Sequence, residues 1–336
     1  MTDPPQIRSV AVLGGGSWGT AFALLCARHG AEVRLVCHTR AQADHIARDR
    51  VNPSYLPGVR IPEGIVVAAA DEPSALSGVD LVALAIPSRV AAGMADLVAA
   101  QISPGTGVVS LTKGLDTASG RRLSELWREA LGGGVPFAVL SGPNHAEEVV
   151  ERQPTAAVVA GDHALGVRLQ ELLNGFDFRV YINDDLVGVE LCAAAKNVIA
   201  IAAGMSDGLG FGDNAKASLI TRGLAEMTRL GRAYGASDAT FRGLAGMGDL
   251  VGTCTSMHSR NRRVGELIAT GMSSTEAEAR LGQVAEGLWS VERLLELADR
   301  AGVELPISQE VAAAVGGKPV ADCMRDLMSR APATEQ

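Results

Sequence analysis

A glycine turn near the N-terminus constrains the fold of this chain more than any other feature of its sequence. An apolar run over residues 9–13 is followed by Gly14, Gly16 and Gly19 in the pattern G-x-G-x-x-G, and an apolar helical stretch begins at Gly19. In such a turn the first glycine allows a tight bend, the second lets a pyrophosphate approach the backbone, and the third lets helix and strand pack closely. The helix N-terminus adds N–H groups and a partial positive charge. The pattern predicts a dinucleotide site; the alternative is a tight strand–helix turn that binds nothing.

The first half of the chain alternates short apolar runs with helical patterns. The runs are rich in Val, Ile and Leu with little polar alternation, which is typical of strands buried on both faces of a parallel sheet. The α/β alternation predicts an N-terminal doubly wound, Rossmann-type domain over residues 1–185. The stretch 39–64 contains Pro53, Pro57 and Pro62 and is expected to be rich in loops. The predicted strands are 9–13, 33–37, 65–68, 81–86, 107–111 and 137–140, with further candidates at 156–160 and 179–182, and the predicted helices include 19–29, 41–50, 90–100 and 123–131.

The second half of the chain changes character after Asp185, because strand-like runs nearly vanish and long helical patterns follow. We therefore expect an all-helical substrate and catalytic domain over residues 186–336. Its most apolar stretch is interrupted by Glu190 and Lys196, so no membrane span is expected. The predicted helices are 186–205, 215–234, 262–270, 274–281, 289–301 and 308–315.

Charge and cysteine usage narrow the class of protein further. The 336 residues include 30 Lys and Arg and 38 Asp and Glu, a net charge of −8, which disfavours a general nucleic-acid binder because phosphate binding needs positive surface. The five cysteines are scattered, and neither they nor the histidines show metal-ligand spacing, so we expect reduced thiols and no metal. The N-terminal MTDPPQ is polar and unlike a signal peptide. We therefore expect a cytoplasmic protein.

The end of the second predicted strand bears on the choice of cofactor. Sites that prefer NAD usually place an acid there to bind the ribose hydroxyls, whereas this chain has His38 and Arg40 and no acid. A cation would attract the 2′-phosphate of NADPH. The sequence predicts that NADPH is accepted and preferred, with NADH as a second cofactor; the alternative is that Arg40 is simply solvated.

A lysine in an apolar helix is the second candidate for chemistry. Lys196 lies in a segment that is hydrophobic almost all round, with Asn197 as a polar neighbour. Desolvation would lower the pKa of this amine toward neutrality, which suits a general acid or base for carbonyl reduction. The alternative is a lysine that extends along the helix surface to reach water.

A third motif combines a glycine-rich stretch over 243–248 with Asp249 and, further on, Ser259, Arg260 and Asn261. Ser259 is a candidate helix cap, and the guanidinium of Arg260 could bind a phosphate with two donors. The pattern indicates an anion site at a helix N-terminus. The alternative is a solvated helix end whose arginines pair with acids.

These segments together carry a family resemblance. GGGSWGTA, LTKGL, SGPNHAEEV, the long block AAAKNVIAIAAGMSDGLGFGDNAKASLITRGLAEM, GLAGMGDLVGTCTS, HSRNRRVG and QVAEG run in order along the chain, and together they resemble bacterial NAD(P)-dependent glycerol-3-phosphate dehydrogenase. The resemblance implies a dinucleotide-binding domain plus a helical domain, usually as a homodimer. It also implies reversible reduction of dihydroxyacetone phosphate to sn-glycerol 3-phosphate, which supplies phospholipid synthesis.

The resemblance also implies roles for individual residues. Lys196 matches the catalytic lysine that gives the proton to the carbonyl oxygen, and Lys113 matches a lysine at the junction of cofactor and substrate. Asn144 stands where bacterial relatives more often have Ser or Thr, and the role of Tyr55 is left open. The matched substrate contacts are Gly142, Asn144, Asp249, Ser259, Arg260 and Asn261, and the matched cofactor contacts are Ser17, Trp18, His38, Ala146, Val284 and Glu286, with Arg260 also near the cofactor.

Two other functions fit parts of the sequence. A β-hydroxyacid or ketopantoate-type reductase also pairs a dinucleotide domain with a catalytic lysine, but a carboxylate substrate needs no second phosphate site such as the one expected around Arg260. A nucleotide-sensing protein without turnover would keep the glycine turn, but it would have no reason to combine Lys196, Lys113 and Asp249.

Overall fold

The computed structural model describes residues 6–331 and contains two compact units that divide between Glu190 and Leu191. This division lies inside helix α7 (Leu186–Gly208), whereas the boundary proposed from the sequence lies where that helix begins. The expectations about the first five residues and the last five fall outside the described part of the chain.

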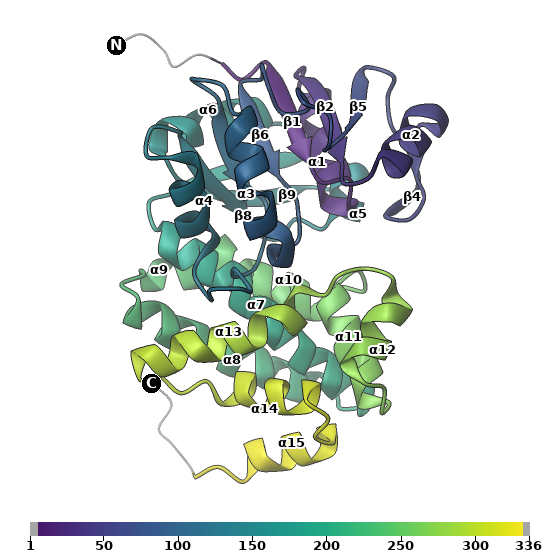
Figure 1. The fold of residues 1–336 in the computed structure, drawn as a ribbon. Helices are drawn as coiled ribbons and strands as arrows, with labels where there is room; N and C mark the ends of the chain where they lie inside the picture. The colour runs from purple at the N-terminus through teal and green to yellow at the C-terminus, as the bar shows by residue number, and fades with distance from the viewer. Residues whose placement is uncertain (1–5, 332–336) are drawn as a thin grey trace. The chain divides into compact units, whose positions relative to one another are not determined.

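The N-terminal unit is built on an eight-stranded sheet in the order β10-β9-β8-β7-β6-β1-β2-β5 (Figure 1). All eight strands predicted from the apolar runs are present, with ends that differ by at most a few residues. The strand order reverses at β1, which lies between β2 and β6, so a switch point forms at the end of β1 where the glycine turn begins. The strands are β1 (Ser9–Leu13), β2 (Glu32–Cys37), β5 (Ile65–Ala69), β6 (Leu81–Leu84), β7 (Gly107–Ser110), β8 (Phe137–Ser141), β9 (Thr155–Gly161) and β10 (Phe178–Asn183).

One pair of strands departs from the expected parallel arrangement. Strand β9 runs antiparallel to β8, with Leu140 opposite Val159, and β10 then runs parallel to β9. The chain between β8 and β9 contains only the five-residue helix α5 (Ala146–Val150), which is shorter than the crossover helices that keep neighbouring strands parallel. The sheet is therefore mixed, with a parallel majority.

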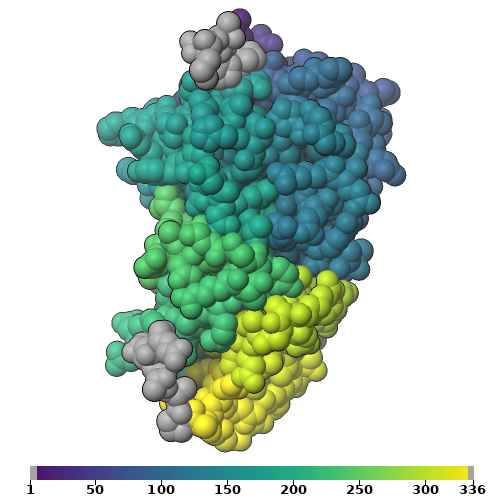
Figure 2. Space-filling model, turned by 90° about the vertical axis from the view of Figure 1, so that its left-hand side faces the viewer, coloured from purple at the N-terminus to yellow at the C-terminus, as the bar shows by residue number. Residues whose placement is uncertain are grey.

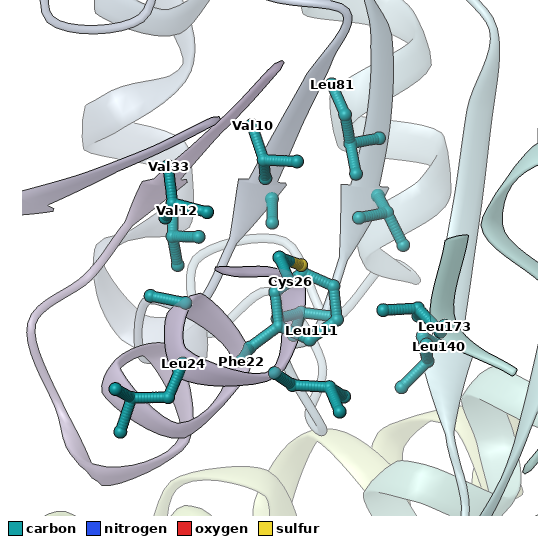
Figure 3. Close-up of a cluster of buried hydrophobic side chains, with 14 of the residues drawn as sticks. Val10, Val12, Phe22, Leu24, Cys26, Val33, Leu81, Leu111, Leu140 and Leu173 are labelled. Carbon is teal, nitrogen blue, oxygen red and sulfur yellow. The ribbon is translucent and has the colours of Figure 1, made fainter. Parts of the chain in front are cut away.

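Helices cover both faces of this sheet, as its core shows. All four residues of β6, from Leu81 to Leu84, are fully buried, so side chains of both orientations are covered. The cluster in Figure 3 joins Val10 and Val12 of β1 to Phe22 and Cys26 of the following helix. The doubly wound prediction is confirmed. The helices of this unit are α1 (Ser17–Arg28), α2 (Arg40–Asp49), α3 (Ser88–Gln101), α4 (Leu123–Leu131), α5 and α6 (His163–Leu173).

A small hairpin replaces part of the loops expected between residues 39 and 64. Strands β3 (Val51–Asn52) and β4 (Leu56–Arg60) pair antiparallel directly after α2. Arg50 joins α2 to the hairpin with a left-handed backbone at φ 55°, and its buried guanidinium donates to the carbonyls of Ile61, Pro62 and Ile65. The sequence did not predict these strands because the stretch contains Pro53, Pro57 and Gly58, and proline and glycine are depleted in strands.

The C-terminal unit is helical throughout its described part. Figure 2 shows one of its faces, where the last helices (yellow) lie against earlier ones (green), in keeping with the packing of α13 and α14 on α8. The sequence missed the short segments 238–242, 244–248, 249–255 and 320–328. The helices after α7 are α8 (Asp213–Ala233), α9 (Asp238–Arg242), the π-helical turn η1 (Leu244–Gly248), α10 (Asp249–Thr255), α11 (Arg260–Ala269), α12 (Ser274–Leu281), α13 (Glu286–Ala301), α14 (Pro306–Val315) and α15 (Val320–Met328).

Helix α7 is the core helix of this unit. It is long and apolar enough to cross a bilayer, but 89% of its most apolar window is buried inside the protein, which favours a core helix. Two glycines bring its backbone against α11. A Cβ at Gly204 would lie 1.8 Å from the carbonyl oxygen of Arg262, and one at Gly265 would lie 2.1 Å from that of Ile201. The two helices therefore touch backbone to backbone.

Candidate active site

The glycine turn has the geometry that a dinucleotide needs. Gly14 adopts a φ of +124°, and a Cβ there would lie 2.2 Å from the carbonyl oxygen of Ala85. A Cβ at Gly19 would lie 1.9 Å from the carbonyl oxygen of Gly14, so the helix packs directly on the turn. A Cβ at Gly16 would meet nothing within 4 Å, which leaves the backbone there open to a ligand. These are the tight bend, the close packing and the open approach that the pattern predicts.

The first turn of α1 presents donors beside this open backbone. Gly16 is the N-cap, and the first turn contains no acidic residue that would repel a phosphate. The indole of Trp18 tilts against Phe22, with ring centroids 6.2 Å apart. Its Nε1 is buried without a hydrogen-bond partner among the described residues. An orphaned donor at this turn fits a bound polar group.

The end of β2 carries an arginine that already has partners. Arg40 pairs with Asp71 at 2.8 Å and with Glu72 at 3.4 Å, and about half of its side chain is exposed. His38 is exposed, and Thr39 caps α2 by accepting from the N–H of Gln42. A cofactor 2′-phosphate at this point would compete with two carboxylates for the guanidinium.

Strands β7 and β8 end beside each other and bring together three of the expected substrate contacts. Lys113 follows β7, and its Nζ donates to the carbonyl oxygen of Gly142 and to Oδ1 of Asn144, each at 2.8 Å. Because an ammonium can only donate, this bond fixes the orientation of the Asn144 amide. The Nδ2 of Asn144 is buried and has no partner among the described residues, so it is a donor available to a ligand. Ala146, at the start of α5, is buried nearby in the chain.

The lysine of the apolar helix is buried in an ion pair. The Nζ of Lys196, on α7, donates to Oδ1 of Asp249 at 2.6 Å and to Oγ1 of Thr253 at 2.8 Å, both on α10. The side chain of Lys196 is 5% exposed, so it does not reach to water along the helix surface. Thr253 also donates to Asp249 at 3.2 Å. The sequence did not predict a role for Thr253, the second partner of Lys196. Its i, i+4 spacing from Asp249 on α10 was the signal available.

The arginines of the third motif separate into different roles. The hydroxyl of Ser259 accepts from the N–H of Arg262 and caps α11. Arg262 is buried and pairs with Asp207 and Glu266, each at 2.8 Å, whereas Arg263 is exposed. Arg260 is half-buried and has no hydrogen-bond or ion-pair partner in the described part of the chain. The pairing of Arg262 with acids agrees in part with the alternative interpretation, although Arg262 is buried and not solvated. The anion site around Arg260 stays a prediction.

Asn261 links three helices through its side chain. Its Nδ2 donates to Oδ1 of Asn197 on α7, and its Oδ1 accepts from the N–H of Gly287 on α13, each at 2.9 Å. These two bonds use the amide oxygen and one of the two hydrogens on Nδ2. The backbone N–H of Asn261 lies in the first turn of α11, where N–H groups lack partners within the helix. Val284 and Glu286, expected to contact the cofactor, are both half-buried and flank the beginning of α13.

Cysteine chemistry is disfavoured at this site. Cys254, the neighbour of Thr253, is a free thiol, and burial raises its pKa to about 12, so it stays protonated at neutral pH. All five cysteines are free and buried. Among residues 6–331 no three His, Cys, Asp or Glu side chains are grouped as metal ligands.

A glycine turn at the switch point of a Rossmann-type sheet, together with a buried Lys–Asp–Thr cluster on helices, defines the class as a dinucleotide-dependent oxidoreductase. Residues 9–165 match the family model described as the NAD-dependent glycerol-3-phosphate dehydrogenase N-terminus, and residues 185–325 match the corresponding C-terminus. The chain therefore belongs to the NAD-dependent glycerol-3-phosphate dehydrogenase family.

Individual relatives agree along almost the whole chain. Glycerol-3-phosphate dehydrogenase (NAD(P)+) of Streptomyces coelicolor is 48% identical over 330 residues, covering 97% of this chain and 98% of the relative. The enzyme of the same name from Prosthecochloris aestuarii is 46% identical over 330 residues, covering 97% and 99%. The crystal structure of glycerol-3-phosphate dehydrogenase from Coxiella burnetii superposes with a TM-score of 0.93 at 40% identity, covering 97% of this chain and 100% of that one.

Proposed function

We propose that this chain catalyses the reversible reduction of dihydroxyacetone phosphate to sn-glycerol 3-phosphate with NADPH or NADH. The observation that carries the proposal is the Lys196 ammonium, held at 2.6 Å from Asp249 in a helical unit that also contains the unpartnered Arg260. A buried proton donor and a phosphate-binding cation are the two groups that this reaction requires. The family membership of the chain supports the same reaction.

The residues of the glycine turn fit the cofactor. The open backbone at Gly16 and the orphaned Nε1 of Trp18 accommodate and bind a pyrophosphate-bearing group at the start of α1. When bound, the reduced nicotinamide supplies the hydride. We assign Gly14, Gly16, Ser17, Trp18 and Gly19 to this site.

Lys196 holds and transfers the proton. As hydride reaches the carbonyl carbon, negative charge develops on the carbonyl oxygen, and an ammonium in a water-poor pocket stabilises it and gives up a proton. Asp249 and Thr253 hold Nζ in place through its two hydrogen bonds. In the reverse direction the neutral amine takes the hydroxyl proton of glycerol 3-phosphate.

The substrate phosphate is assigned to the N-terminus of α11. Arg260 supplies a guanidinium with two parallel donors, and the N–H groups of the first helical turn supply the rest. Ser259 fixes where this helix begins. Lys113, Gly142 and Asn144 are proposed to bind the polar end of the substrate, with Nδ2 of Asn144, which has no partner among the described residues, as a donor.

Further parts of the proposal concern the setting of the enzyme. We propose a cytoplasmic homodimer that supplies glycerol 3-phosphate for phospholipid synthesis, with NADPH preferred over NADH. The preference rests on His38 and Arg40, which follow β2 directly, while the carboxylates of Asp71 and Glu72 that pair with Arg40 would compete with the 2′-phosphate.

A spectrophotometric assay of NADPH oxidation by the purified chain tests the proposal. Turnover with dihydroxyacetone phosphate and none with ketopantoate is expected. Turnover only with a ketoacid would favour the alternative reductases, and NADPH binding without turnover of any of these ketones would favour a nucleotide sensor.

A further inference from the structure

The carbonyl oxygen of Gly15 accepts hydrogen bonds from two side-chain amides. Nε2 of Gln42, on α2, donates to it at 2.7 Å, and Nδ2 of Asn52, on β3, donates to it at 2.9 Å. Gly15 is the one residue of Gly14-Gly15-Gly16 that the G-x-G-x-x-G pattern does not require. Both amides come from the stretch that the sequence predicted to be loop-rich.

Asn52 binds the helix as well as the turn. It is 2% exposed, and its Nδ2 also donates to Oγ1 of Thr20 on α1 at 2.9 Å. An amide nitrogen has two hydrogens, so both are used. The hydroxyl of Ser17 makes a second link by donating to the carbonyl oxygen of Tyr55 at 2.9 Å. The hairpin is therefore bonded to the glycine turn and to the first turn of α1.

Gly15 is a glycine because these neighbours approach it closely. A Cβ at this position would lie 2.8 Å from Sγ of Cys37 and 3.0 Å from Nε2 of Gln42. Distances of this size would push the amide of Gln42 away from the carbonyl oxygen. The extra glycine is thus explained by the bond that Gln42 makes, and not by the cofactor directly.

The two amides fix the direction of one peptide plane. The C=O of Gly15 and the N–H of Gly16 belong to the same planar trans peptide and point in opposite directions. Holding the oxygen toward Gln42 and Asn52 therefore aims the N–H of Gly16 away from them. Gly16 is the position where a Cβ would meet nothing within 4 Å, so this N–H borders the open approach described above.

The hairpin that carries Asn52 is held in place by contacts at both of its ends. Arg50 holds the base of the hairpin through the carbonyls of Ile61, Pro62 and Ile65. Leu56, at the start of β4, is 2% exposed and packs in a small cluster with Ala21 of α1 and Ala146 of α5. The hairpin is therefore held by Arg50 where it begins and by Leu56 at its second strand.

We propose that Asn52 and Gln42 are positioning residues for the dinucleotide, and that they act by orienting the Gly15–Gly16 peptide so that the N–H of Gly16 donates to the pyrophosphate. The inference rests on the proposed cofactor site. Neither side chain touches the reacting atoms. Preorganised donors bind an anion more tightly because little freedom is lost on binding. Both NADPH and NADH carry the pyrophosphate, so the effect is the same for the two cofactors.

The test uses the full-length chain with Gln42→Met, Asn52→Ala and the double variant. Gln42 is half-buried, so Gln42→Met keeps the test valid if Asn52→Ala fails to fold. Gln170→Met is the matched control, because the amide of Gln170 also donates to a backbone carbonyl, that of Val180, at 2.8 Å within the same unit. Titration calorimetry gives the dissociation constant of ADP-ribose, a probe that carries the pyrophosphate but cannot react.

We expect ADP-ribose to bind about threefold more weakly to Gln42→Met and about tenfold more weakly to Asn52→Ala, on the scale of lost neutral hydrogen bonds. The KM values for NADPH and NADH should rise together, with kcat and the KM for dihydroxyacetone phosphate unchanged. Unchanged ADP-ribose binding in the folded variants, an equal loss in Gln170→Met, or a fall in kcat alone would overturn the inference. Failure of the wild-type chain to reduce dihydroxyacetone phosphate would refute the proposed function instead, because ADP-ribose binding needs no turnover.

Discussion

The side-chain amide of Asn261 donates to that of Asn197 over 2.9 Å, and each of these residues is the sequence neighbour of a proposed functional one. Asn197 follows Lys196 on α7, and Asn261 follows Arg260 on α11. The bond joins the helix that carries the proposed proton donor to the helix that carries the proposed phosphate-binding cation. The two helices are thereby held together next to both residues by one buried contact.

Removing the amine of Lys196 should lower turnover strongly without abolishing cofactor binding. We expect Lys196→Met to lower kcat by ~10²–10⁴, the usual contribution of a positioned proton donor. The unpaired Asp249 should also destabilise the fold by about 3–5 kcal/mol. Adding Asp249→Asn should restore the melting temperature but not kcat. Lys318→Met, which removes a lysine paired with Glu310 and Asp326, is the control that should retain activity. A kcat of Lys196→Met equal to that of the wild type would refute the role.

Substitutions of the three arginines of α11 should differ in whether they change the KM for the substrate or the melting temperature. Arg260→Ala should raise the KM for dihydroxyacetone phosphate on the order of 10- to 100-fold, since a charged hydrogen bond is lost, with little change in melting temperature. Arg262→Ala should instead lower the melting temperature, because Glu266 loses its partner and Asp207 keeps only Lys216. Arg263→Ala should change neither quantity. An unchanged substrate KM in Arg260→Ala would remove that residue from the phosphate site.

The acids that hold Arg40 should influence cofactor preference. Asp71→Asn should raise the ratio of kcat/KM for NADPH over that for NADH by about two- to fivefold, because an exposed ion pair is worth about 0.2–1 kcal/mol and its loss frees the guanidinium. Arg40→Ala should lower the same ratio. Steady-state kinetics with both cofactors check this, with Asp322→Asn, at the Asp322–Arg325 surface pair, as the control. If neither variant changes the ratio of kcat/KM for NADPH over that for NADH, the residues at the end of β2 do not bind the 2′-phosphate.

Glu190 should make stability depend on pH. Burial raises the pKa of this carboxyl, although hydrogen bonds from Ser124 and the guanidinium of Arg122 oppose the rise. The folded state therefore binds the proton more tightly than the unfolded state. Its stabilising contribution is full below the unfolded pKa and is lost as pH rises through the folded pKa.

The corresponding variant is Glu190→Gln, compared with the wild-type chain by thermal unfolding from pH ~5 to ~8. The melting temperature of the wild type minus that of Glu190→Gln should decrease as pH rises. Glu129→Gln, which removes an exposed partner of Arg121, should show no such trend. A flat difference for Glu190→Gln would mean that its carboxyl titrates at an ordinary pKa.

The sequence predicted the elements that carry a local apolar run or a helical pattern and missed those that depend on tertiary contacts. The eight sheet strands and the glycine turn follow from apolar runs and from glycine spacing. The antiparallel β9, the hairpin that contains Asn52 and the π-helical turn before Asp249 have no such periodic signal. At the site, Lys196 and Arg260 stood out as charges in unusual settings. The commitment of Arg40 to Asp71 depends on residues thirty-one positions apart, and no local pattern reports such a pairing.

The glycines at 204 and 265 have a mechanical consequence. The backbones of α7 and α11 are in direct contact at these two positions, with no side chain between them that could deform. Even one added methyl group at either position would wedge these helices apart and lengthen the span between the amine and the guanidinium. On the proposed assignment of Lys196 and Arg260, these two glycines therefore help to set the distance between the groups that bind the two ends of the substrate.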